Sequence, residues 1–183
     1  MSTRMMSRLA CVVGIAICTL GYSRCTFVSN PDGTPVDPGL PGNNGVFVTS
    51  LTLRDSSGVE TANFVMGEPI RLDLEGLNRD SQSRILQFAD AQIYDFYVFD
   101  AGTHRVRWRW SANKSFPQMG TQLTFMANSS KLYSVDWDGV LADGSQLPVG
   151  SYQARGIFVA DGYSGDPLAA SELASDLVTF TVR

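Results

Sequence analysis

The stretch YDFYVFDAGTHRVRWRWS, residues 94–111, decides the fold because apolar and polar residues alternate on both sides of a turn. Its eighteen positions hold six aromatic and four basic residues. Alternation of period two is typical of a half-buried strand, and the Asp-Ala-Gly-Thr between the two runs is typical of a turn. We therefore predict a β-hairpin whose aromatic residues are core, instead of a nucleic-acid patch or a catalytic cluster around His104.

A loop of three residues, 101–103, sorts the hairpin into one apolar and one polar face. The apolar face then pairs these residues across the strands: Tyr94 with Trp110, Phe96 with Trp108, and Val98 with Val106. The opposite face carries these pairs: Tyr97 with Arg107, Phe99 with Arg105, and an ion pair of Asp95 with Arg109. A slip by one residue would exchange the two faces, so the pattern selects this register. The outer face, with Tyr97, Arg105 and Arg107, is a candidate contact surface.

Runs with strand-like composition continue outward from this hairpin. The runs before it are 47–53, 68–78 and 84–88, and those after it are 131–137, 150–161 and 176–183. Turn residues separate the runs, and only 167–175 has the composition of a helical turn. Seven or eight antiparallel strands within 138 residues predict an all-β fold, an immunoglobulin-like antiparallel β-sandwich.

The N-terminal part differs from the rest in composition. Residues 1–24 are typical of a secretory signal peptide, since arginines precede an apolar run too short for a membrane span. Residues 25–45 are rich in proline and glycine, which predicts a flexible linker before a domain at 46–183. Cys25 is a candidate lipidation site, and ordinary cleavage after Ser23 is the alternative. We expect export to the periplasm, the cell envelope or the medium, with membrane contact only through the signal or a lipid.

Composition argues against several classes of function. The net charge of −4 disfavours a nucleic-acid partner. The single histidine, His104, lies at a predicted hairpin tip, which disfavours both a catalytic triad and a zinc site. The acidic run 136–143 lacks the spacing of an EF-hand calcium loop. We expect no cofactor, no metal ion and no enzymatic activity.

A motif of eleven residues runs through the centre of the chain. It reads Q-x-Y-D-F-x-V, then W-R-W-S and F-x-Q, and comprises Gln92, Tyr94, Asp95, Phe96, Val98, Trp108, Arg109, Trp110, Ser111, Phe116 and Gln118. Further on, Trp137-Asp138 precedes LPVGSYQARG, which contains Tyr152. This order resembles the intracellular proteinase inhibitor family, the BsuPI-type domain, over residues 65–160. We expect most of these residues to be structural. The export signal, the long linker and the spacer 119–134 depart from the family pattern.

The resemblance implies a β-sandwich that inhibits a subtilisin-like serine protease by non-covalent binding. A tight inhibitor presents a rigid loop to the enzyme cleft, and the candidate loops are 113–120 and 161–167. The candidate contacts in the first loop are Phe116, Pro117, Gln118 and Met119. Pro117 would stiffen the loop, while Phe116 or Met119 would fill a specificity pocket; alternatively, Phe116 packs under the end of the sandwich. The other open hypothesis is a non-enzymatic interaction module of the cell envelope or surface, which binds its partner through the outer face and has no inhibitory activity.

Overall fold

Ten short strands make up the fold of residues 46–183, which are the residues that the computed structural model describes. The strands are β1 (Phe47–Arg54), β2 (Asn63–Phe64), β3 (Ile70–Asn78), β4 (Arg84–Phe88), β5 (Tyr94–Asp100), β6 (Val106–Arg109), β7 (Thr121–Phe125), β8 (Ser129–Trp137), β9 (Gly150–Phe158) and β10 (Val178–Val182). Each predicted run coincides with a strand, while β2 and β7 were not expected. The helical turn predicted at 167–175 is wrong, because this segment forms non-helical turns.

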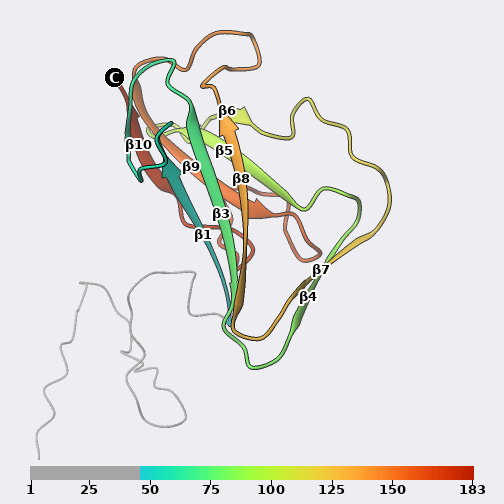
Figure 1. Cartoon of the computed structure of the whole chain (residues 1–183). Helices are drawn as coiled ribbons and strands as arrows, with labels where there is room; N and C mark the ends of the chain where they lie inside the picture. The colour runs from blue at the N-terminus through green and yellow to red at the C-terminus, as the bar shows by residue number, and fades with distance from the viewer. Residues whose placement is uncertain (1–45) are drawn as a thin grey trace, which may run out of the picture. The chain divides into compact units, whose positions relative to one another are not determined.

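The strands form two sheets and a separate ribbon (Figure 1). One sheet has the order β1-β3-β8 and the other has the order β2-β10-β9-β5-β6. The ribbon β4-β7 lies at one end of β3 and β8. All pairings are antiparallel except that of β2 with β10. The predicted all-β class is confirmed, and the architecture is consistent with the predicted sandwich.

No helix within residues 46–183 is long and apolar enough to cross a membrane. The predicted signal segment, the predicted linker and Cys25 lie outside the described residues.

Aromatic rings fill the space between the two sheets and the ribbon. Phe47 of β1, Phe125 of β7 and Phe158 of β9 meet edge to face, with ring centroids 4.9–6.0 Å apart. This geometry adds to the stabilisation that their burial provides. Gly156 faces Leu74 across the core, and a Cβ on it would lie only 2.6 Å from Leu74 Cδ1. The sheets therefore approach closely at a position where only hydrogen fits.

The β5–β6 hairpin forms as predicted, but its pairing differs. Tyr97 lies opposite Arg109 and Val98 opposite Trp108, a shift of two residues from the predicted register. A bulge follows, so that Phe99 pairs with Val106. The loop holds four residues, since the amide of Asp100 donates to the carbonyl of Arg105 and His104 adopts a left-handed φ of 54°. Val106, predicted to be core, is consequently 44% exposed.

The outer face of the hairpin is covered, which corrects a second prediction. Tyr97 and Phe99 were expected to face solvent, but they are buried with Ile157 and Ala174 in a small second core. The segment between β9 and β10 supplies the cover, because the amide of Ser175 donates to the carbonyl of Gly156 and Ala174 bridges to Ile157. Tyr97 therefore drops out as a candidate contact residue.

Candidate partner-binding site

Asp95 in β5 ties the central motif together. Its side chain is fully buried, and Oδ2 accepts hydrogen bonds from Arg109 Nε at 2.7 Å and Ser111 Oγ at 2.6 Å. Oδ1 accepts from the backbone amides of Ser111 and Phe96 at 3.1 and 3.0 Å. The predicted ion pair with Arg109 is confirmed, but its carboxylate end is enclosed. Asp95 thus fixes the backbone at the point where the chain leaves β6.

The electrostatics around this ion pair follow from burial and charge. Burial acts to lower the pKa of Arg109, but the hydrogen bond and the charge of Asp95 outweigh it and raise the pKa above its usual value. Burial also raises the pKa of Tyr97, with the Asp95 charge adding to the effect. Both groups therefore keep their protons at any physiological pH.

Trp108 in β6 and Trp110 just after it each pack against other aromatic rings. Trp108 stacks on Trp137 of β8, with ring centroids 4.6 Å apart and planes at 22°. Trp137 Nε1 donates to the carbonyl of Val140 at 2.9 Å, so the indole also holds the loop after β8. Trp110 packs against Tyr94 at 4.8 Å and against Phe116 at 5.8 Å. The predicted core role of the aromatic residues is confirmed, although Trp108 and Trp110 remain partly exposed.

The loop 112–120 is exposed along almost its whole length, yet both of its halves are held. At its start, the amide of Lys114 donates to the carbonyl of Ser111, the residue that Asp95 binds. Further along, the amide of Ala91 donates to the carbonyl of Pro117 at 3.0 Å, and Gln118 Nε2 lies 3.5 Å from Asp90 Oδ2. The turn at Asp90 and Ala91 was not anticipated, because these two residues stand out in no sequence pattern.

The two predicted anchor residues of this loop, Phe116 and Met119, differ in exposure. Phe116 is half-buried against Trp110, as the alternative prediction of a packed Phe116 had it. Met119 is 64% exposed and stands next to Gly120, which is also exposed. Pro117 and Gln118 between them are exposed as well. Of the candidate contacts, Met119 offers the largest free apolar side chain.

Other signature residues serve the framework. Gln92 Nε2 donates to the carbonyl of Tyr94 at 3.2 Å, and the hydroxyl of Tyr152 donates to the carbonyl of Pro148 at 2.8 Å. Of the outer arginines, Arg105 is exposed, while Arg107 is half-buried and its Nε finds no hydrogen-bond partner among the described residues.

The second candidate loop, 161–167, is less free than the first. Its Tyr163 points inward and packs beside the Tyr97 cluster, and the carbonyl of Pro167 accepts from Arg155 Nη1 at 2.9 Å. Arg155 is itself buried, which lowers its pKa. This segment therefore behaves as a cover for the sheet more than as a presented loop.

The polar residues weighed earlier for catalysis or metal binding have local structural partners. Asp138 accepts from the amide of Val140, and Asp143 accepts from the amide and hydroxyl of Ser145, so both carboxylates cap turns. His104 is exposed at the hairpin tip. Within residues 46–183, no three His, Cys, Asp or Glu side chains gather in a way that could hold a metal ion.

Comparison with known families gives a match to the model described as "Intracellular proteinase inhibitor" (BsuPI), over residues 58–163. The chain belongs to this inhibitor family. The matched range covers more than half of the chain and contains the whole motif around Asp95, together with the loop 112–120. Membership gives the domain an inhibitor-like character in general, with a protease as the general class of partner. Comparison with curated protein sequences gives no match.

Solved structures with a similar arrangement include several β-glucosidases. That of Erythrobacter marinus shares 10% identity at a TM-score of 0.40, over 75% of this chain and 15% of the enzyme. That of Listeria innocua, in complex with isofagomine, shares 13% identity at 0.38, over 86% of this chain and 19% of the enzyme. The chain thus spans less than a fifth of the length of these enzymes. Similarity at this level says nothing about the activity of this chain.

Proposed function

We propose that this chain inhibits a subtilisin-like serine protease by presenting the loop 112–120 to the enzyme's cleft, with Met119 as the side chain that enters the specificity pocket. Family membership supports a protease as the partner. We choose the loop 112–120 because it is exposed and yet hydrogen-bonded in both halves. Lys114 donates to the carbonyl of Ser111, and the carbonyl of Pro117 accepts from the amide of Ala91.

A restrained loop is suited to inhibition for a physical reason. A flexible segment loses conformational freedom when it binds, whereas a loop already held in one conformation avoids most of that cost. Pro117 removes further freedom because its ring fixes φ. If the enzyme cleaved the chain after Met119, the hydrogen bonds at Lys114 and Pro117 would hold the part before the cut, and the pairing of β7 with β4 would hold the part after it. Release of a cleaved product would therefore be slow. No group of the inhibitor takes part in chemistry, and the proposal involves no catalytic residue.

Met119 is the preferred anchor for two reasons. Its side chain is free, while that of Phe116 is engaged with Trp110 and could enter a pocket only by leaving that contact. A single apolar side chain in a fitted pocket contributes about 1.5–3 kcal/mol from burial alone. Gly120, immediately after it, leaves room for the enzyme's backbone to approach.

We further propose that the inhibitor acts outside the cytoplasm. The support is the sequence of residues 1–24, with basic residues before an apolar run. A site of action in the periplasm, at the cell envelope or in the medium would make an exported protease the target.

The test is a titration of the purified protein against a panel of subtilisin-like and trypsin-like proteases, with residual activity measured on a peptide substrate. We expect stoichiometric inhibition of at least one subtilisin-like enzyme, and at least a hundredfold loss of affinity for Met119→Asp. The matched control is Met66→Asp, which changes another exposed methionine, after β2, and should leave inhibition intact.

Two outcomes would contradict the proposal. If no enzyme of the panel is inhibited at micromolar concentration while the protein stays intact, the interaction-module hypothesis replaces inhibition. If inhibition occurs but survives Met119→Asp, another part of the surface makes the contact. Thermal melting of both variants checks that the fold is unchanged.

A further inference from the structure

We infer that this protein has a second binding surface, separate from the Met119 end of the inhibitory loop, that takes an extended acidic peptide with an apolar residue at its centre. The surface is the hollow beside β6, which we call the β6 groove. It has a volume of about 360 Å³ and lies between strand β6 with its following turn and the loop after β8. Its lining residues are 106–110, 112–114 and 140–142. This inference goes beyond the proposed function, because Met119 takes no part in it.

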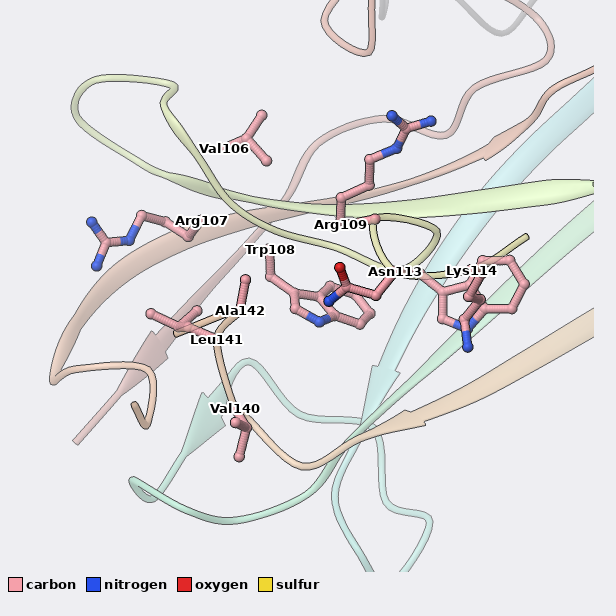
Figure 2. A pocket seen from close by; sticks show the side chains of 11 residues that line it. Val106, Arg107, Trp108, Arg109, Asn113, Lys114, Val140, Leu141 and Ala142 are labelled. Carbon is pink, nitrogen blue, oxygen red and sulfur yellow. The ribbon is translucent and has the colours of Figure 1, made fainter. Parts of the chain in front are cut away.

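The floor of the β6 groove is aromatic and rigid. Trp108 leaves β6 on the side where Val140, Leu141 and Ala142 lie (Figure 2), and its stacking on Trp137 fixes the ring. The opposite wall is fixed too, because Trp137 Nε1 holds the carbonyl of Val140. The hollow therefore exists before any ligand arrives, and a large apolar side chain would bury its surface there without a prior rearrangement.

Positive charge stands at the two ends of this floor. Figure 2 shows Arg107 at one end, beyond Leu141 and Ala142, and Lys114 at the other end. The ammonium group of Lys114 lies 4.6 Å from the centre of the Trp110 ring. Arg109 leaves the strand on the side away from Trp108 and is engaged with Asp95, so it contributes only to the local field.

The guanidinium of Arg107, unpaired in the described part of the chain, indicates where a ligand would bind. Its Nε is buried and finds no hydrogen-bond partner among residues 46–183, and it forms no ion pair within that part of the chain. The protein itself shields this Nε, but the terminal nitrogens of the same guanidinium are not buried and form no hydrogen bond within residues 46–183. A carboxylate placed against them would gain charge-assisted hydrogen bonds. A shallower hollow of about 240 Å³ adjoins the β6 groove at this end, between Arg105, Arg107 and Asp143.

The charge distribution also selects the kind of partner. The protein as a whole carries a net charge of −4, yet the linings of the two adjoining hollows contain Arg105, Arg107, Arg109 and Lys114 against the single carboxylate of Asp143. A second copy of this chain paired along β6 would bring arginines against arginines, which disfavours a dimer through this edge. An acidic partner is attracted by the same charges.

A peptide fits the lining better than an acidic sugar does. Asn113 is the one uncharged polar side chain of the β6 groove, so a sugar's hydroxyl groups would find few partners. The lining otherwise consists of tryptophan, aliphatic and cationic side chains. In addition, β6 ends its sheet and pairs with β5 alone, which leaves an open edge beside which an extended chain can lie.

The experiment uses the purified protein and three fluorescein-labelled decapeptides, with binding measured by fluorescence anisotropy. The first peptide has a Phe-Leu pair flanked by four glutamates on each side, the second has Ser-Ser in place of Phe-Leu, and the third has lysines in place of glutamates. We expect saturable binding of the first peptide alone. Its affinity should fall as salt is raised, because the contacts are largely ionic.

Variants locate the contact. Arg107→Glu and Lys114→Glu should each weaken the first peptide at least tenfold, while Arg79→Glu, the same change at an exposed site after β3, should have no effect. Inhibition of a protease should survive Arg107→Glu and be lost in Met119→Asp, so failure of one proposal is distinguishable from failure of the other. Thermal melting identifies any variant that has lost its fold.

Three results would overturn the inference. The first is the absence of saturable binding of the Phe-Leu peptide up to millimolar concentration. The second is equal binding by the wild-type protein and by both glutamate variants. The third is tighter binding of an oligouronate than of the peptide, which would make the β6 groove a carbohydrate site.

Discussion

Replacing Asp95 with alanine should lower the free energy of unfolding by about 3–5 kcal/mol, the range found when one partner of a buried ion pair is removed. Most of this cost comes from Ser111, whose amide and hydroxyl both donate to Asp95. Ser111 is itself buried, so water cannot readily replace the lost acceptor. Each buried donor left unsatisfied costs about 1–3 kcal/mol, and two of them account for the expected range.

The guanidinium end of the same pair should behave differently. The Arg109 side chain is 44% exposed, so it recovers its hydrogen bonds from water when the carboxylate is absent. Arg109→Gln removes the counter-charge and one hydrogen bond of the buried Asp95 carboxylate, but leaves its bonds from Ser111 and Phe96. It should therefore cost about 1.5–3 kcal/mol, the usual contribution of a hydrogen bond to a charged group and less than the cost of Asp95→Ala. The expected asymmetry between the two substitutions is the distinctive part of the prediction.

The assay is equilibrium unfolding in urea, followed by the fluorescence of the three tryptophans and extrapolated linearly to water. A double-mutant cycle with Ser111→Ala should give a coupling energy of about 0.5–3 kcal/mol. A loss below about 1 kcal/mol for Asp95→Ala, or an equal loss for Arg109→Gln, would refute this account of the buried carboxylate.

The remaining predictions concern the core and the response to acid. Gly156→Ala should lower the free energy of unfolding by about 1–3 kcal/mol, because its Cβ would lie 2.6 Å from Leu74 Cδ1; unchanged thermal melting would show that the sheets can separate without cost. Burial acts to raise the pKa of Asp73, but hydrogen bonds from Ser134, Arg71 and Arg54 outweigh it and leave the pKa below its ordinary value of 3.8. Stability from Asp73 is therefore full above the unfolded pKa of about 4 and is lost as pH falls through the lower folded value. Melting temperatures measured from pH 6 to pH 2 should fall less steeply for Asp73→Asn, and parallel curves would contradict this assignment.

The strands were predictable because alternation in this chain is clear wherever one side of a strand is buried. The β5–β6 register was not, although the sequence correctly separated the aromatic face from the arginine face up to Val98. A shift of two residues leaves every side chain on its own face, so alternation cannot distinguish the two pairings. The register is set by the four-residue loop, which His104 closes in a left-handed conformation. The sequence Ala-Gly-Thr-His does not predict this loop.

The candidate site was predictable only in part. The loop 113–120 could be found from its position in the family motif, but the choice between Phe116 and Met119 depends on the distance to Trp110. The burial of Tyr97 was missed because a single strand does not show what covers its outer face. The one signal was β9, where Ala154 and residues 156–158 form an almost unbroken apolar run, as expected of a strand buried on both faces.

The sheet order has a consequence for the kinetics of folding. β3 completes its pairing only when β8 arrives, and β5 only when β9 arrives, and in both cases a long stretch of chain lies between the partners. Domains built mainly from such distant pairings fold on the order of milliseconds to seconds, more slowly than helical proteins of similar stability. A chain that remains unfolded for that time stays threadable, which is the state that a secretion channel accepts. The topology is therefore compatible with the export that residues 1–24 predict.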